Sequence, residues 1–236
     1  MQEHKPKLLV IIPAFNEEAN VGAVVRDVRE SVPDADIVVI DDGSDDATAA
    51  AAGRAGANVL RLPYNMGIGA AMQTGYRYAS LGGYDVAVQV DADGQHPADE
   101  ITRLAGPVLT GMSDMAVGSR FLSDGNYRPS LARSAGMSIF SRVVSAIIKV
   151  RMTDTTSGFR AAGKRCIAYF SRHYPDDYPE VEALVLLHRM GFSIMEVPVT
   201  MRRRSGGQSS ITPARSVYYM IKVLLAIFVD LLKKAG

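Results

Sequence analysis

Two aspartates directly follow an apolar run in the stretch VAVQVDADGQHPAD, residues 86–99. No lysine or arginine stands near Asp91 and Asp93 in the sequence, and two carboxylates at this spacing repel each other unless a positive charge lies between them. A divalent metal, arginines from elsewhere in the chain, or exposure to water would each relieve this repulsion. Mg²⁺ is commonly held by one or two carboxylates together with substrate phosphates. The pair therefore marks a candidate metal site, with a solvated turn as the alternative; His96 is either a supporting group or exposed.

A second acidic pair, Asp41 and Asp42, ends another apolar run and precedes Gly43 and Ser44. Either carboxylate has the chemistry to accept a hydrogen bond from a nucleotide base or ribose. An ordinary Asx turn that caps the following helix is the alternative, and for this motif taken alone the turn is favoured.

Two glycines, Gly67 and Gly69, stand near the start of an expected helix and loosely resemble a phosphate-binding loop. The third glycine of the dinucleotide-binding fingerprint is missing from this stretch, and no acidic ribose partner follows at the usual distance. The stretch therefore argues against a dinucleotide-binding fold.

Charged residues elsewhere in the chain suit phosphate binding or acid–base chemistry. Any single arginine is more simply explained as a solvated charge, but together the arginines match a site that holds a pyrophosphate and a second phosphate. Glu180 and Glu182 open an expected helix, where they serve as a general base or as charges that stabilise the helix N-terminus. The arginines are Arg120, at an expected strand end, Arg128, Arg133, Arg160 and the run Arg202–Arg204.

The bulk composition is that of one large globular domain. The chain has 236 residues, of which 47% are hydrophobic and 22% charged. A net charge of +1 gives no support for nucleic-acid binding. The single cysteine, Cys166, excludes an internal disulfide and a cysteine-based zinc site, which fits a reducing compartment. The N-terminal apolar run is too short for a signal peptide, and no segment has the roughly 18 apolar residues of a spanning helix.

Short β-rich runs alternate with helical stretches through the first 120 residues. This alternation predicts an α/β fold with a mainly parallel sheet, whose ligands bind beyond the carboxyl ends of the strands. Six polar side chains should therefore share one edge of the sheet: Asn16, Asp41, Asp42, Asp91, Asp93 and Arg120. The expected strands cover 7–13, 36–42, 57–62, 84–93 and 114–120. Three helices are expected between them: one from an N-cap at Asn16 to about Ser31, an alanine-rich one after the GSDD stretch, and one over 65–79.

The second half of the chain carries two expected amphipathic helices, at 131–150 and at 213–234. Between them we expect a short strand within 155–161, a helix over 178–191, a strand over 192–201 and a basic glycine- and serine-rich loop over 202–210. The apolar faces of the two amphipathic helices pack either into the core or a dimer interface, or into the surface of a membrane. Residues 1–212 are expected to form the main domain and 213–236 a C-terminal amphipathic helix.

Seven motifs, taken in order, resemble those of the family 2 glycosyltransferases of the GT-A fold. They are IIPAFNEEANV, VIDDGSDD, NMGIGAAMQTG, VQVDADGQHP, VGSRF, DTTSGFRA and MRRRSGGQSS. The similarity runs from about residue 7 to 212 and is greatest to the polyprenyl-phosphate sugar synthases, such as dolichol-phosphate mannose synthase and its bacterial relatives. Each motif is unspecific alone, but seven in the right order are highly specific.

The resemblance implies a catalytic domain over residues 1–212 and a role for each candidate residue. The nucleotide pocket would be lined by Pro13, Phe15 and Glu17, with Asp42 and Asp41 at the base or ribose. Asp91 would lie beside the sugar and nucleotide, and Mg²⁺ or Mn²⁺ would be held by Asp91, Asp93 and Gln95. Arg120 and Arg133 would face the sugar diphosphate or the acceptor phosphate. Ser209 would meet the acceptor phosphate, on a loop that also carries Arg202 and Arg204 and closes over the substrates. A departure stands at Met137, where a hydroxyl residue would assist the acceptor phosphate.

The activity implied by the resemblance is inverting, metal-dependent transfer of one hexose from a nucleotide-sugar to a polyprenyl phosphate. The enzyme would be cytoplasmic and peripheral on the inner face of the cell membrane, with a membrane-protein partner or a second copy as further contacts. One alternative is a polysaccharide or cell-wall glycosyltransferase with a sugar hydroxyl as acceptor, for which Glu180 or Glu182 would be the base. Another is a catalytically silent nucleotide-sugar-binding subunit, against which the intact aspartate motif argues.

Overall fold

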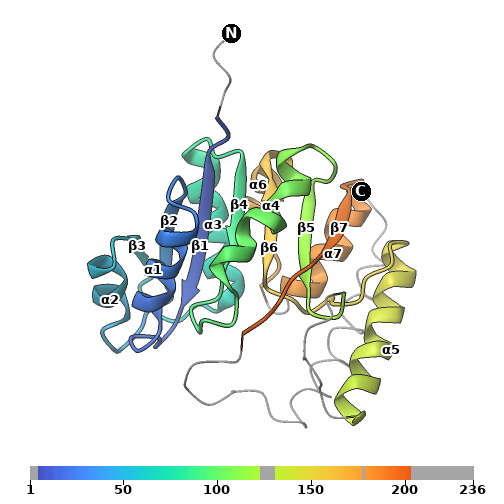
Figure 1. The fold of residues 1–236 in the computed structure, drawn as a ribbon, viewed down its shortest axis with the longest axis horizontal. Coiled ribbons are helices and arrows are strands. Elements are labelled where there is room, and N and C mark those ends of the chain that lie inside the picture. The colour runs from blue at the N-terminus through green and yellow to red at the C-terminus, as the bar shows by residue number, and fades with distance from the viewer. Residues whose placement is uncertain (1–4, 123–130, 177–178, 203–236) are drawn as a thin grey trace.

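Seven strands form one sheet in the order β3-β2-β1-β4-β6-β5-β7 (Figure 1). The structure is a computed structural model that describes residues 5–122, 131–176 and 179–202, with the side chains of 131–139 outside the description. The strands are β1 (Leu8–Ala14), β2 (Asp36–Asp41), β3 (Asn58–Arg61), β4 (Val86–Gln89), β5 (Met115–Ser119), β6 (Arg160–Gly163) and β7 (Ile194–Pro198).

The sheet is mainly parallel, as the sequence predicts. β1 pairs in parallel with β2 and β4, β2 with β3, and β5 with β7. Only β6 reverses the direction among the described strands, because it runs antiparallel to both β4 and β5. The carboxyl ends of the other strands therefore lie along one edge, together with the amino end of β6.

Helices cover both faces of the sheet. α3 (Ile68–Leu81), α5 (Leu131–Ile148), α6 (Lys164–Phe170) and α7 (Pro179–Arg189) contribute to the core on one face. α1 (Val21–Ser31), α2 (Thr48–Arg54), the 3₁₀ turn η1 (Ala98–Glu100) and α4 (Ile101–Leu109) contribute to the core on the other. Because both faces are buried, the central strands are almost wholly apolar, as in other covered parallel sheets.

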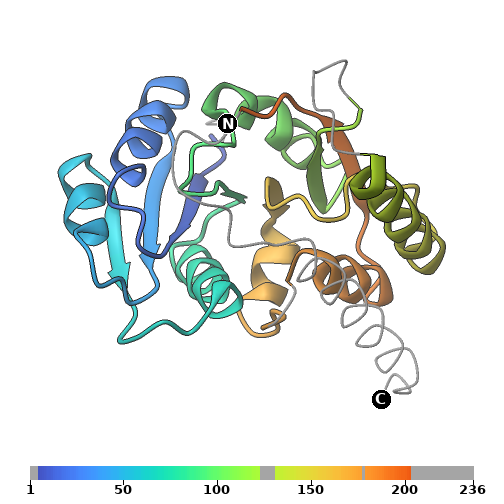
Figure 2. The same ribbon diagram turned by 90° about the horizontal axis from the view of Figure 1, so that it is seen from below.

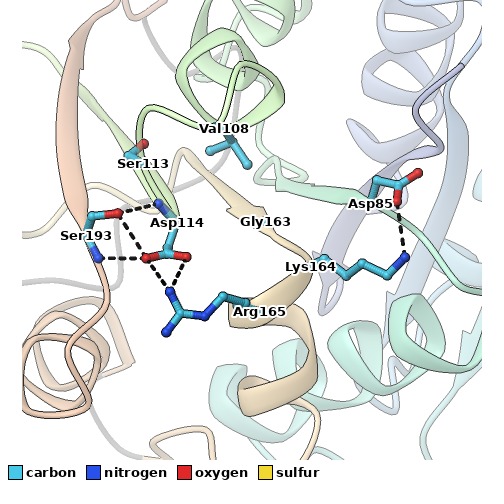
Figure 3. A pocket seen from close by; sticks show the side chains of 9 residues that line it. Asp85, Val108, Ser113, Asp114, Gly163, Lys164, Arg165 and Ser193 are labelled. Carbon is cyan, nitrogen blue, oxygen red and sulfur yellow. Dashed lines mark hydrogen bonds and ion pairs between the residues drawn. The ribbon is translucent and has the colours of Figure 1, made fainter. Parts of the chain in front are cut away.

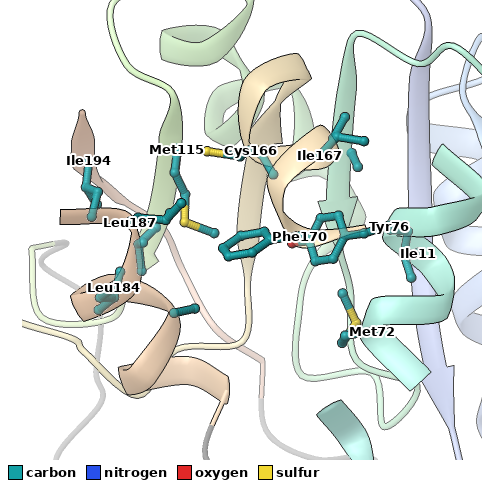
Figure 4. Close-up of a cluster of buried hydrophobic side chains, with 14 of the residues drawn as sticks. Ile11, Met72, Tyr76, Met115, Cys166, Ile167, Phe170, Leu184, Leu187 and Ile194 are labelled. Atoms are coloured by element: carbon teal, nitrogen blue, oxygen red, sulfur yellow. The ribbon is translucent and has the colours of Figure 1, made fainter. Parts of the chain in front are cut away.

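The core beneath α3, α6 and α7 is rich in aromatic side chains (Figure 4). Tyr76 and Phe170 lie with their ring centroids 5.0 Å apart, and Tyr174 packs against both rings. Gly75 lets α3 approach the sheet, since a Cβ at this position would collide with Ile11. The close packing of α3 on the sheet follows from this small residue and from the aromatic layer.

Helix α1 begins later than the sequence predicts. Val21 is its first residue and Asn20 occupies the N-cap position, whereas Asn16 was expected there. Asn16 instead has a φ of 54°, and its N–H donates to Ser44 Oγ over 2.9 Å. The expectation was wrong because contacts with the loop after β2 hold residues 15–20 outside the helix.

Other boundaries shift for reasons that are tertiary. The strand expected within 155–161 begins at Arg160, because the carbonyls of Thr155 and Ser157 accept hydrogen bonds from the Arg160 side chain. The helices α4 and α6 were not predicted at all. In α4, Pro107 and Gly106 weaken the helical pattern, yet Ile101, Leu104 and Ala105 bury one face against the sheet.

The apolar face of α5, where its side chains are described, packs on the protein's own core. Phe140, Val144 and Ile148 are buried there, while Val143 remains 36% exposed. In the part of the chain that the structure describes, no helix combines the length and the apolarity needed to cross a membrane. The amphipathic helix expected at 213–234 lies outside the described residues.

Candidate active site

The polar side chains that the sequence places after strand ends do share one edge of the sheet. Asp41 ends β2, Asp91 follows β4 and Arg120 follows β5, and these strands point in the same direction. Figure 2 views the molecule from this side, with the ends of the strands toward the reader. The prediction of a common edge is confirmed.

Asp91 is held in place by its neighbours on three sides. Its backbone N–H donates to His96 Nδ1 over 3.0 Å, and Gln89 Nε2 donates to its Oδ1 over 3.3 Å. Because Nδ1 accepts a hydrogen bond, the proton of a neutral His96 is on Nε2, which lies 3.6 Å from Asp91 Oδ2. His96 is buried and stacks on Phe159. A Cβ at Gly158 would lie 3.2 Å from both carboxylate oxygens, so this glycine leaves room for the Asp91 side chain.

Asp93 starts a tight turn in which its Oδ1 accepts the N–H of Gln95 over 3.0 Å. Among the residues that the structure describes, no three histidine, cysteine or acidic side chains converge into a complete metal cage. Partly exposed carboxylates at Asp91 and Asp93, with the amide of Gln95 beside them, instead fit a metal whose remaining ligands come from phosphate and water. The donor set therefore suits Mg²⁺ or Mn²⁺ shared with a diphosphate.

The acidic pair at the end of β2 is buried and bound to backbone. Asp41 Oδ1 accepts the N–H of Ser44 over 3.0 Å, and its Oδ2 lies 3.3 Å from Arg61 Nε. Asp42 accepts the N–H groups of Met66 and Gly67 on its two oxygens. Both carboxylates thus hold loops at the edge of the sheet, a role close to the Asx turn that the sequence offered as an alternative.

The loops after β1 and β2 are joined by side chains. Glu17 N–H donates to Thr48 Oγ1 over 2.8 Å, and Asp45 N–H donates to Asn16 Oδ1 over 3.0 Å. Of the residues expected to line a nucleotide pocket here, Pro13 is buried, Glu17 is half-buried and Phe15 is exposed. The two segments are thus fastened together, with Phe15 partly exposed beside them.

Arg120 is bound by a fully buried carboxylate. Its Nε and Nη2 donate to the two oxygens of Asp154 over 2.6 and 2.7 Å, in a bidentate pair. The Asp154 side chain is 0% exposed and that of Arg120 is 22% exposed. The segment that carries Asp154 is anchored to β7, where Glu196 accepts the N–H groups of Thr153 and Asp154.

A model of glycosyl transferase family 2 matches residues 9–168. The chain belongs to this family. Polyprenol monophosphomannose synthase of Mycolicibacterium smegmatis is 32% identical over 230 residues, which cover 92% of this chain and 85% of the relative. Undecaprenyl-phosphate mannosyltransferase of Micrococcus luteus is 32% identical over 222 residues, 87% of this chain and 88% of the relative.

Solved structures agree on the fold. Glucosyl-3-phosphoglycerate synthase from Mycobacterium tuberculosis, in complex with Mn²⁺, uridine diphosphate and phosphoglyceric acid, superposes with a TM-score of 0.72. The match covers 95% of this chain and 78% of the other, at 22% identity. The expected GT-A fold is confirmed.

In this glycosyltransferase a second arginine is buried beneath the aspartate motif. Arg160 is 1% exposed, and it stands opposite Gln89 in the sheet register. Its Nε and Nη2 donate to the carbonyls of Ser157 and Thr155 over 2.7 and 3.3 Å, while its Nη1 has no hydrogen-bond partner among the described residues. Arg160 thus stabilises the segment before β6 rather than meeting solvent as a free cation.

Glu180 and Glu182 lie in the first turn of α7, as predicted, and both are half-buried. Burial raises the pKa of Tyr174 well above its ordinary value, and the negative charges of Glu180 and Asp91 raise it further. Glu180 is therefore electrostatically close to the same phenol as Asp91.

Arg202 does not lie over the aspartate motif with its side chain. Its backbone N–H donates to the carbonyl of Gln95 over 2.9 Å, but its guanidinium Nη1 bonds Asp27 over 2.6 Å and Nη2 lies 3.7 Å from Asp99. Arg204 and Ser209 lie outside the described residues, and Arg133 is placed on α5 without a described side chain.

A hollow at the opposite edge of the sheet is closed by its own ion pairs (Figure 3). Arg165 Nη1 donates to both oxygens of Asp114 over 2.9 and 3.1 Å, and Lys164 Nζ lies 3.4 Å from Asp85. These charges balance one another within the hollow.

Three residues of this site were not identified from the sequence as holding it together: Asp154, Gly158 and Glu196. His96, which the sequence offered as a supporting group, does hold Asp91. Asp154 stands in the motif DTTSGFRA, where a polar run before a short strand is a usable signal. Glu196 sits in an apolar strand and gives no local sign of its partners.

Proposed function

We propose that this glycosyltransferase moves one hexose from a nucleotide-sugar to a polyprenyl phosphate with inversion at the anomeric carbon, in a reaction that requires a divalent metal. The observation that carries the proposal is the placement of the Asp91–Asp93 motif and of Arg120 on one edge of the sheet. Carboxylates suit a metal-bound donor diphosphate, and a guanidinium suits an acceptor phosphate. The relatives named for mannosyl transfer to polyprenyl phosphates support this acceptor class.

Asp91, Asp93 and Gln95 would hold Mg²⁺ or Mn²⁺ against the donor. Such a metal supplies charge neutralisation of the departing nucleoside diphosphate. The chain's own residues supply its orientation. His96 holds the Asp91 backbone and Gln89 its carboxylate, and the Asp93 side chain fixes the backbone of Gln95 in the following turn.

A phosphate acceptor requires less catalytic assistance from the protein than a hydroxyl acceptor does. A phosphate oxygen is already an anion at neutral pH, so it attacks without a strong general base. What it requires is a cation that binds and orients it, and Arg120 lies at this edge with its guanidinium held in place by a buried carboxylate. Arg133 and Ser209 remain proposed as further phosphate contacts.

A hydroxyl acceptor is the second candidate, with Glu180 or Glu182 as the base. A sugar hydroxyl needs a base to remove its proton. Either Glu180 or Glu182, both half-buried in the first turn of α7, is proposed as that base. The products differ, because a sugar linked through a phosphodiester is released by mild acid and an ordinary glycoside is not.

The test is a panel of donors with undecaprenyl phosphate in detergent. UDP-glucose, UDP-galactose, UDP-GlcNAc, GDP-mannose and dTDP-rhamnose are each incubated with Mn²⁺ and with EDTA. We expect acid-labile lipid-linked sugar from one donor, and none with EDTA. An acid-stable product formed on a sugar acceptor would favour the hydroxyl candidate. Neither transfer nor donor hydrolysis with any donor would favour a silent nucleotide-sugar-binding subunit.

We further propose that the enzyme works on the inner face of the cell membrane as a peripheral protein, because a polyprenyl tail leaves the bilayer only at high cost. The full chain should float with anionic liposomes at low salt, and a chain that ends near Thr212 should float less. Sedimentation of the full chain without the liposomes would contradict this location.

A further inference from the structure

A chain of buried contacts leads from the edge strand β7 to Arg120. Glu196 Oε1 accepts the N–H of Asp154 over 2.7 Å, and its Oε2 accepts the hydroxyl of Thr153 over 3.0 Å. Thr153 Oγ1 also lies 2.6 Å from Ser119 Oγ, at the end of β5. The backbone at 153–154 is thus fastened to two strands at once.

Asp154 connects this fixed backbone to the guanidinium of Arg120. Both of its carboxylate oxygens bond Arg120 side-chain nitrogens, and its Oδ2 also accepts the Arg120 backbone N–H over 3.2 Å. Thr156 Oγ1 accepts from Arg120 Nη2 over 3.3 Å. A guanidinium held at Nε and Nη2 by one buried carboxylate loses its rotational freedom, so its orientation is set before any ligand arrives.

Asp154 itself cannot be a ligand for substrate, since its side chain is 0% exposed. We infer that Asp154 is a positioning residue that orients Arg120 toward the acceptor phosphate, and that Glu196 holds Asp154 in place. This inference rests on the proposed function, because it takes Arg120 as a phosphate-binding group. Breaking the pair would leave the guanidinium mobile, which weakens acceptor binding while the donor side stays intact.

The test compares four variants of the full chain with undecaprenyl phosphate and the donor that supports transfer. Arg120→Gln, Asp154→Asn and their double variant form a cycle, and Glu196→Gln is the fourth. We expect Arg120→Gln and Asp154→Asn each to raise the KM for undecaprenyl phosphate by about tenfold to a hundredfold, with the donor KM within about twofold. If Asp154 acts through Arg120, the double variant will be no worse than Arg120→Gln.

Asp114→Asn is the matched control. It removes one charge from another aspartate–arginine pair, in which Arg165 Nη1 donates to both Asp114 oxygens at the opposite edge of the sheet. It should leave both KM values unchanged, which separates a local effect on Arg120 from a general loss of stability.

The outcomes are distinguishable. If Arg120→Gln leaves the acceptor KM unchanged, Arg120 has no role in acceptor binding. That result contradicts this part of the proposed function and overturns the inference as well. A raised acceptor KM in Arg120→Gln but not in Asp154→Asn overturns the inference alone, as does an equal rise in the donor KM. If Asp154→Asn does not fold, Glu196→Gln decides, because it keeps the size of the side chain and leaves both Asp154 and Arg120. An unchanged acceptor KM in that variant also counts against the inference.

Discussion

Gly67 donates its backbone N–H to the carboxylate of Asp42 over 2.9 Å, just before α3 begins. Met66 donates to the other carboxylate oxygen over 2.8 Å, and Asp42 is 4% exposed. Gly67 has a φ of 92°, which glycine adopts readily and other residues do not. The second aspartate of the DD motif therefore fastens the loop before α3 to the end of β2.

Replacing Asp42 should cost stability. Asp42→Asn keeps one acceptor oxygen and loses the charge, so one of the two backbone N–H groups loses its partner. We expect a loss of about 1–3 kcal/mol in the free energy of unfolding, measured by urea denaturation. Asp45→Asn, an exposed position in the same segment, is the control and should change stability little. An Asp42→Asn variant as stable as wild type, with a raised donor KM, would show that Asp42 acts on the nucleotide instead.

Asp93→Asn should abolish transfer and leave the fold intact. An amide is a poorer metal ligand than a carboxylate and lacks its charge. Mn²⁺ titration followed by electron paramagnetic resonance, in the presence of nucleoside diphosphate, should show weakened metal binding with an unchanged melting temperature. Asp99→Asn, at an exposed position of the nearby 3₁₀ turn η1, serves as the control. Turnover close to wild type with the same metal dependence would contradict the metal assignment.

Gly158→Ala tests how closely Asp91 is held. The added Cβ would lie 3.2 Å from both Asp91 carboxylate oxygens and 3.0 Å from Gln89 Nε2, so the carboxylate must shift by a few tenths of an ångström. We expect kcat to fall by about tenfold, since displacement of a catalytic group by a fraction of an ångström is costly. Gly53→Ala, where a Cβ meets nothing within 4 Å, should leave kcat unchanged. Equal activity of the two variants would contradict the proposed role of Asp91.

The pair at the far edge of the sheet should make stability depend on pH. Burial acts to raise the pKa of Asp114, but hydrogen bonds from Ser193 and the charge of Arg165 outweigh it and lower that pKa. A carboxyl with a lowered pKa stabilises the fold above its unfolded pKa of about 3.9, and this contribution is lost as pH falls through the folded value. The free energy of unfolding of wild type should exceed that of Asp114→Asn by about 1 kcal/mol at pH 7, and by less near pH 3. A stability difference that grows as the pH falls would contradict a lowered pKa of Asp114.

Cys166, the only cysteine in the chain, should be unreactive in the native protein. It is fully buried in the core beneath α6, and burial raises the pKa of its thiol far above the ordinary value. A thiol reacts as the thiolate, so iodoacetamide should modify the native chain much more slowly than the chain in 6 M urea. Rapid modification of the native protein, measured by mass spectrometry, would show that this core opens readily.

The sequence by itself determined which residues lie at the carboxyl edge of the sheet. Apolar runs of strand length that alternate with helices specify a parallel sheet, and the residue after each run must then lie at the carboxyl edge. Asp41, Asp91 and Arg120 were placed in this way without any structure. Local patterns suffice here because the direction and length of a strand decide where the residue that follows it lies.

Only the tertiary structure decided how these residues are held. Asp154 meets Arg120 across 34 residues of sequence, and Glu196 meets Thr153 across 43. The start of α1 moved to Val21 because Asn16 bonds a loop 28 residues away. Hydrogen bonds between distant segments produce no periodic pattern in the sequence. Each partner fits the pattern of its own helix, strand or loop whether or not the other partner is present. The reversal of β6, which brings Gly158 against Asp91, is a pairing choice of the same kind.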